Sequence, residues 1–104
     1  MNPQLFQVLA EQNRLDIVEL LRNGAKSVNE ITARLRLNQP QVSKHLRVLS
    51  DAGVVEVHPM AQSRYYQLSP QPFKELETWL DRYKSTWNQR LTRLDQVLKK
   101  EVRK

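Results

Sequence analysis

Two helix-start signals lie close together in the middle of the chain, and their spacing limits the fold more than any other feature. The first is Ser27-Val28-Asn29-Glu30 and the second is Asn38-Gln39-Pro40-Gln41. In each, the first side chain can accept from the backbone N–H three residues on, while the Glu or Gln reaches back to the first residue's own N–H. A helix that begins at Val28 must therefore end near Arg36, because Leu37-Asn38 is left to form a tight corner before the next helix.

The second of these helices has a clear apolar side and a clear end. On a helical wheel Leu46 and Leu49 lie within about 40° of Val42, so the three form a narrow stripe that faces a core. Pro40 is compatible with the helix because it lies in the first turn. Gly53 follows Asp51-Ala52 and ends the helix. The sequence therefore predicts two short helices joined by a tight corner over residues 27–53.

The pattern of the chain changes after residue 53. Residues 54–58 are rich in valine and predict a strand, residues 59–63 a loop, and residues 64–68 a returning strand, so residues 54–68 form a hairpin. From Phe73 onward no breaker interrupts apolar residues spaced three or four apart, which predicts one long helix over residues 71–102. Before residue 27, Asn2-Pro3 is expected to open one short helix, and Asn13 to cap another that stops at Asn23-Gly24. We therefore expect a mainly α protein with a small β-hairpin, in the order α-α-α-α-β-β-α, as a single domain over residues 1–104.

The side of the 39–52 helix that faces away from its apolar stripe carries amides, a hydroxyl and cations. In a helix-turn-helix the second helix enters the DNA major groove, where amides read adenine and Arg or Lys read guanine. A polar helix face can also be a plain solvated surface, but the neighbouring corner and hairpin favour DNA recognition. Residues 34–64 also carry five bases against two acids, within a chain of formal net charge +6. The predicted DNA-binding residues are Gln39, Pro40, Gln41, Ser43, Lys44, His45, Arg47 and Arg64.

Two of these predictions leave alternatives open. His45 lies about 60° from the apolar stripe, at its edge. It can therefore be an amphipathic side chain that bridges core and surface, or a phosphate or base contact. The hairpin tip from Pro59 to Arg64 is polar with a cation at its base. It can reach phosphates or the minor groove, or it can be an ordinary hairpin with one surface arginine.

Three stretches resemble the ArsR-type winged-helix repressors over nearly the whole chain. They are residues 13–21, residues 39–55 and residues 64–68, and the most specific is the Val42-Ser43-x-His45-Leu46-x-x-Leu49-x-x-Ala52-Gly53-Val54 pattern. The resemblance implies a winged helix-turn-helix fold and a homodimeric bacterial repressor. It also implies an imperfect inverted repeat in double-stranded DNA, bound through the 39–52 helix and the 59–64 wing, and a dimer interface made by the first and last helices. A cytoplasmic location is expected separately, because the sequence shows neither a membrane span nor a signal peptide.

The chain departs from the metal-sensing members of that family. It has 0 Cys, and the region that carries their thiol motif is Glu30-Ile31-Thr32-Ala33-Arg34-Leu35. The last helix has Asp81 and Asp95 but no histidine, whereas zinc needs about four N, S or O ligands. We therefore expect no metal site, no cofactor and a chain of the cysteine-free, metal-independent branch. No acid–base pair or nucleophile stands out, so no enzyme is expected, and no apolar run approaches the ~20 residues of a membrane span.

The long last helix predicts self-association. About 30 helical residues extend roughly 45 Å, and one small body cannot cover an apolar stripe of that length. A two-fold dimer is the simplest solution, although the basic last turns can also fray. Trp79 and Trp87 are expected to pack or to lie in this interface rather than to hold a ligand. The predicted dimer-interface residues are Leu5, Phe6, Leu9, Phe73, Leu76, Leu80, Tyr83, Trp87 and Leu94.

Two other function classes remain open at this point. A winged-helix protein–protein adaptor would need an acidic or apolar recognition face and would have no affinity for DNA. A non-specific architectural DNA binder would bind any duplex equally, whereas Gln39, Gln41 and Ser43 favour base reading. The operator, the regulated genes and the release signal, whether a ligand, a partner protein or dilution, do not follow from the sequence.

Overall fold

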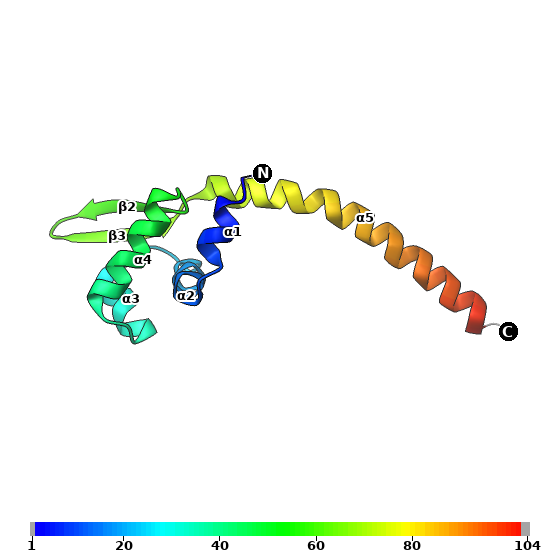
Figure 1. Cartoon of the computed structure of the whole chain (residues 1–104), viewed down its shortest axis with the longest axis horizontal. Helices are drawn as coiled ribbons and strands as arrows, with labels where there is room; N and C mark the ends of the chain where they lie inside the picture. The colour runs from blue at the N-terminus through cyan, green and yellow to red at the C-terminus, as the bar shows by residue number, and fades with distance from the viewer. Residues whose placement is uncertain (1, 103–104) are drawn as a thin grey trace. The chain divides into compact units, whose positions relative to one another are not determined.

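The computed structural model of the protein describes residues 2–102, and their order of elements confirms the expected fold with one addition. The helices are α1 (Gln4–Leu9), α2 (Gln12–Leu21), α3 (Val28–Leu35), α4 (Gln39–Asp51) and α5 (Pro70–Val102). The strands are β1 (Lys26–Ser27), β2 (Val55–Met60) and β3 (Ser63–Leu68) (Figure 1). The described residues form two compact units, residues 2–72 and the rest of α5 from Phe73, and each is described by itself.

The core of the first unit lies among α2, α3 and α4. Ile17, Ile31 and Leu46 are fully buried, one from each helix. The predicted stripe of α4 is confirmed, because Val42 and Leu49 are buried as completely as Leu46. Burying a leucine or valine side chain contributes roughly 1.5–3 kcal/mol each, so this stripe fixes α4 firmly against the other helices.

Both predicted capping boxes are present. The Ser27 Oγ accepts from the Glu30 N–H at 3.2 Å, and the Glu30 Oε1 accepts from the Ser27 N–H at 3.2 Å. Between the two helices Arg36 adopts a left-handed conformation with φ 56°, which turns the chain sharply after α3. The corner is therefore made by a non-glycine residue in a conformation that costs about 1–2 kcal/mol, which the two capped helices hold in place.

The start of α2 differs from the expectation. Glu11, not Asn13, is its N-cap, and the Glu11 Oε2 accepts from the Arg14 N–H at 2.9 Å. The helix therefore begins at Gln12, and Asn13 lies inside its first turn. A glutamate side chain can accept from the N–H three residues on, as the more usual N-cap residues do, and this places the start of the helix two residues earlier than Asn13 would.

The hairpin is longer, and its turn tighter, than predicted. β2 and β3 pair in antiparallel register from Val55 opposite Leu68 to Met60 opposite Ser63, so only Ala61 and Gln62 form the turn. Ala61 has φ 55°. Pro59 lies inside β2 and not in a loop. This is tolerated because the strand order β1-β3-β2 places β2 at a sheet edge, where a missing N–H breaks no ladder.

The third strand, β1, was not predicted. Lys26 pairs with Tyr66 and Ser27 with Tyr65 in antiparallel register, directly before α3 begins. The hairpin is thus the outer part of a three-stranded sheet, and Figure 1 shows it projecting from the helices as a two-stranded ribbon. Pairing with β1 fixes the base of the hairpin next to the start of α3, which positions the wing relative to the two central helices.

Candidate nucleic-acid interface

The start of α4 is held by its own cap. The Asn38 Oδ1 accepts from the Gln41 N–H at 2.9 Å, and the Gln41 Oε1 accepts from the Asn38 N–H at 3.2 Å. Pro40 lies in the first turn, as expected. The Gln41 amide oxygen is therefore occupied by the cap, and its NH₂ group is what remains to donate outward. Gln39 takes no part in this cap, and it is exposed.

The predicted recognition face of α4 is exposed in the structure. Gln39, Pro40, Gln41, Ser43, Lys44 and Arg47 are all exposed. Pro40, Ser43, Lys44 and Arg47 lie on the side opposite the buried stripe, and Gln39 and Gln41 flank the N-terminal end of the helix. Arg64, on β3, is exposed as well. The side chains that sequence reasoning assigned to DNA are thus accessible to a duplex, with His45 as the exception.

A groove of about 430 Å³ separates α4 from the hairpin. Ser43 and Arg47 line it from α4, and Arg64 and Tyr66 line it from β3. Because both arginines border one groove, an anionic strand that enters it meets a cation on each side. Sequence reasoning did not find the rest of the lining, because it depends on how the sheet packs on α4. These residues are Val28, Leu46, Ser50, Asp51 and Val57.

A second hollow, of about 250 Å³, lies at the other side of Arg64. Gln39 lines it from the start of α4, Asn29 from the start of α3, and Gln62 from the hairpin turn. Arg64 borders both hollows and so joins the wing to the beginning of the recognition helix. Gln62 and Asn29 are additional polar residues at this surface. In the sequence, the polarity of Gln62 and Asn29 is the only sign that they could belong to this surface, because no local pattern shows that the hairpin turn lies near α3.

His45 does not share the exposed face. Its side chain is 16% exposed, and its Nδ1 lies 3.7 Å from the Oε2 of Glu11, the N-cap of α2. This Nδ1 is buried and, within the described residues, has no hydrogen-bond partner. The structure therefore favours the interpretation of His45 as a side chain that bridges core and surface over a direct DNA contact.

Two carboxylates of this unit have a lowered pKa. The hydrogen bond that Glu11 accepts from the Arg14 backbone N–H is the main cause for Glu11, and the charge of Arg14 adds to it. The backbone and hydroxyl hydrogen bonds from Ser27 lower the pKa of Glu30 in the same way. Both caps therefore favour the ionised carboxylate, the form that accepts hydrogen bonds without competition from its own proton.

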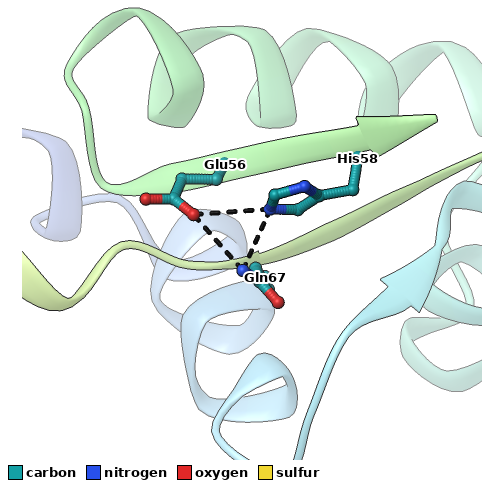
Figure 2. Close-up of polar contacts among 3 residues, drawn as sticks. All are labelled: Glu56, His58 and Gln67. Atoms are coloured by element: carbon teal, nitrogen blue, oxygen red, sulfur yellow. Dashed lines mark hydrogen bonds and ion pairs between the residues drawn. The ribbon is translucent and has the colours of Figure 1, made fainter.

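The outer face of the hairpin carries a separate polar cluster. Figure 2 shows Glu56 and His58 of β2 and Gln67 of β3 turned toward one another. The Gln67 Nε2 lies 3.2 Å from the Glu56 Oε2 and 3.0 Å from the His58 Nε2, and those two atoms are 3.4 Å apart. All three side chains are accessible. Among residues 2–100, no group of three His, Asp or Glu side chains is arranged to hold a metal ion.

The residues predicted for a dimer interface differ in how much surface they offer. Leu5 is 6% exposed, so little of it is available to a partner, whereas Phe6 is 43% exposed and Leu9 is half-buried. On α5, Phe73 and Leu76 are half-buried. Further along lies what we call the α5 stripe, a row of exposed apolar side chains from 39% to 60% exposed that consists of Leu80, Tyr83, Trp87, Leu91, Leu94 and Leu98.

The pattern of residues 11–57 matches the model of the bacterial regulatory protein arsR family, and these residues contain α2, α3, α4 and the start of β2. Over 96 residues the chain is 38% identical to the HTH-type transcriptional regulator Rv2034 of Mycobacterium tuberculosis, a match that covers 92% of this chain and 87% of that regulator. The chain belongs to the arsR family. Its fold is a winged helix-turn-helix, with α3 and α4 as the helix pair and β2–β3 as the wing.

Solved structures agree with this assignment. HlyU of Vibrio cholerae is 34% identical, with a TM-score of 0.66 over 76% of this chain and 86% of that one, and its curated name is transcriptional activator. Mb0332 of Mycobacterium bovis is described as a homodimeric winged helix-turn-helix DNA-binding domain. It is 24% identical, with a TM-score of 0.65 over 79% of this chain and 76% of that one, so it supports the fold alone. The expected role in transcription regulation is confirmed at the level of the family.

No helix in residues 2–102 combines the length and the apolar character that crossing a membrane requires.

Proposed function

We propose that the chain is a homodimeric repressor that binds an imperfect inverted repeat in double-stranded DNA. α4 lies in the major groove, and the wing contacts the adjoining backbone. The protein acts in the cytoplasm without a metal or cofactor, and it is not an enzyme. The observation that carries the proposal is the groove between α4 and the hairpin, bordered by Arg47 and Arg64 beside the exposed polar start of α4.

This surface combines contacts to base edges with contacts to phosphates. Gln39, Ser43 and Lys44 project from the start of α4, the part of a recognition helix that reaches base edges. Arg47 and Arg64 border the groove instead, where a cation neutralises phosphate without reading sequence. The first group therefore provides specificity, and the second provides affinity that depends on salt.

The homodimer is supported by the α5 stripe. Six large apolar side chains exposed along one face of a helix form a patch that a soluble monomer rarely presents. A second copy brings an identical stripe, so a two-fold pair buries both. Two recognition helices in fixed geometry then read half-sites about one helical turn apart, roughly 10–10.5 bp centre to centre or a small multiple.

The experiment is selection of bound duplexes from a random pool, followed by binding measurements on the selected sequence and on a scrambled duplex. We expect a two-fold symmetric consensus. Each of Gln39→Ala, Ser43→Ala and Lys44→Ala is expected to cost roughly 1–3 kcal/mol on the selected duplex and to relax one base position. Arg82→Ala on α5 is the matched control and is expected to leave the consensus unchanged.

Two alternatives make different predictions in the same experiment. A non-specific architectural DNA binder would yield no consensus and equal affinity for both duplexes. A winged-helix protein–protein adaptor would bind neither. The exposed cations and amides around the groove favour the specific repressor over both.

A further inference from the structure

The recognition helix contains one ionisable side chain that faces the protein and not the solvent. His45 is 16% exposed, and its Nδ1 is shielded from water without a hydrogen-bond partner in the described part of the chain. Buried polar atoms are nearly always hydrogen-bonded, so an unpaired ring nitrogen needs an explanation. The group that it faces is the Glu11 carboxylate, with the Nδ1 and the Oε2 3.7 Å apart.

Glu11 is a fixed partner. Its Oε2 accepts the Arg14 N–H at 2.9 Å as the cap of α2, and the Arg14 Nε donates to the Val8 carbonyl of α1 at 2.7 Å. The carboxylate is therefore held at the point where α1, α2 and α4 meet. The other charged group that α2 brings to this point is the Arg14 guanidinium, and α1 has no charged side chain. On α4 itself the neighbouring Lys44 and Arg47 are on the exposed face.

The geometry distinguishes between the forms of the imidazole. If Nδ1 carries no proton, its lone pair faces a carboxylate and the contact is repulsive. If Nδ1 carries the only proton, the ring turns a donor toward the carboxylate, but 3.7 Å is too long for a hydrogen bond and the ring has no net charge to add attraction. When both nitrogens are protonated, the ring is a cation beside a fixed anion, and a charge-assisted hydrogen bond can form with a small movement of the side chain. The contact therefore favours the protonated histidine.

We propose that His45 is a positioning residue that holds the recognition helix against the cap of α2, and that operator binding is coupled to its protonation. The inference rests on the proposed function, because it assigns a pH response to the same DNA-binding surface. A protonated His45 pulls α4 toward Glu11 and so favours the position of the helix that binds the operator. The DNA-bound state consequently holds the proton more tightly than the free state, and affinity falls as the pH rises through the range in which histidine titrates.

The test compares four proteins on the selected duplex and on a scrambled duplex, by fluorescence anisotropy from about pH 5.5 to about pH 8.0 at fixed ionic strength, the range that brackets histidine titration. They are the wild type, His45→Gln, Glu11→Gln and His58→Gln. The amide oxygen that Glu11→Gln introduces can still accept the Arg14 N–H, so the α2 cap is preserved, and melting curves check the fold. His58→Gln is the matched control, because His58 is the other of the 2 histidines and also lies beside a glutamate, Glu56, on the exposed outer face of the wing.

We expect the wild type to lose about five-fold in affinity across this range, and His58→Gln to lose the same. His45→Gln and Glu11→Gln are both expected to show flat profiles. The salt dependence of His45→Gln is expected to equal that of the wild type, since a positioning residue releases no counterion. A Glu11→Gln profile as steep as that of the wild type would overturn the proposal. A salt slope about one unit shallower in His45→Gln would overturn it too, because His45 would then be a phosphate contact.

A second readout does not depend on an operator. The His45 ring resonances of the free protein are followed by NMR against pH in the wild type and in Glu11→Gln. The titration midpoint is expected to lie lower in Glu11→Gln, because the variant removes the anion that favours the cation. Equal midpoints would overturn the proposal. If the selected and scrambled duplexes bind equally while the midpoints differ, the proposed sequence-specific function fails but the His45–Glu11 coupling stands.

Discussion

α4 and α5 are both amphipathic helices, but the apolar face of α4 is buried whereas that of α5 is exposed. In α4, Val42, Leu46 and Leu49 are 0% exposed, because α2, α3 and the sheet surround them. In α5, Leu80, Trp87 and Leu94 are 39%, 60% and 53% exposed. The apolar face of α4 is thus buried within its own chain, and its polar face remains exposed and can bind DNA. The 33 residues of α5 extend about 50 Å, and its free face is apolar, which fits a protein partner and not a nucleic acid.

The largest expected effect is the loss of a buried leucine from α4. Leu46→Ala should lower the free energy of unfolding by about 2–5 kcal/mol, because it removes fully buried methyl groups and leaves a cavity. Leu94→Ala in α5 should leave the melting of the first unit unchanged and weaken self-association. The measurement is chemical denaturation followed by helix signal, with sedimentation for association. Equal destabilisation of the first unit by both variants would break the distinction between the two helices.

Arginine substitutions sharpen the same comparison at the level of charge. Arg47→Ala and Arg64→Ala should weaken binding to selected and scrambled duplexes alike, and each should make the salt slope about one unit shallower, since one phosphate contact is lost. Arg93→Ala on α5 should change neither quantity. Binding titrations at several salt concentrations supply both numbers. A loss confined to the selected duplex would mean that the arginines read bases.

The cap of α4 is expected to be worth less. Asn38→Ala removes the acceptor of the Gln41 N–H and should cost about 1 kcal/mol of stability. It should also lower operator affinity, because the cap fixes the turn that carries Gln39. Ser85 lies at an exposed position in the middle of α5 and caps no helix, so Ser85→Ala should not change the stability measurably. Thermal melts of the two variants test this directly, and equal melting temperatures would show that the cap contributes nothing.

The smallest effect concerns pH and the α2 cap. The folded-state pKa of Glu11 is lowered, chiefly by the Arg14 N–H, so the stability that it contributes is present above its unfolded pKa. That stability is lost as the pH falls below 4.5 through the lowered folded value. Glu11→Gln should therefore unfold with a shallower acid limb than the wild type, while Glu19→Gln, a surface variant of the same helix, should follow the wild-type curve. Identical acid limbs for all three proteins would contradict the assigned cap.

Much of the fold could be predicted because its strongest signals are local. The boxes at Ser27 and Asn38 need only four consecutive residues each, and the stripe of α4 needs one helical period, so both were read correctly. β1 was missed because two residues have no periodicity, and its pairing with Tyr65 and Tyr66 depends on a contact distant in sequence. The short hairpin turn was missed because Ala61 gives no sign of the left-handed conformation that it adopts.

The candidate site was predictable in its residue types but not in its shape. Exposure of Ser43, Lys44 and Arg47 follows from the wheel, since the opposite face is apolar, whereas Gln39 is exposed because it lies at the N-terminal end of the helix. The wheel placed His45 correctly at the edge of that face but did not reveal its partner, because Glu11 lies in another part of the chain, at the cap of α2. Likewise the two hollows that meet at Arg64 depend on the sheet packing against α3 and α4, which no local pattern encodes.

The central claim is that α4 reads DNA as one of two copies held together through the α5 stripe. Sedimentation of the chain at micromolar concentration, with and without the selected duplex, tests it most directly when wild type, Leu80→Glu/Trp87→Glu and the control Ser85→Glu are compared. We predict a species of twice the chain mass for the wild type and for Ser85→Glu. For the doubly charged variant we predict a folded monomer with weak, salt-sensitive DNA binding. A wild-type monomer that binds the selected duplex tightly would contradict both the interface and the inverted repeat.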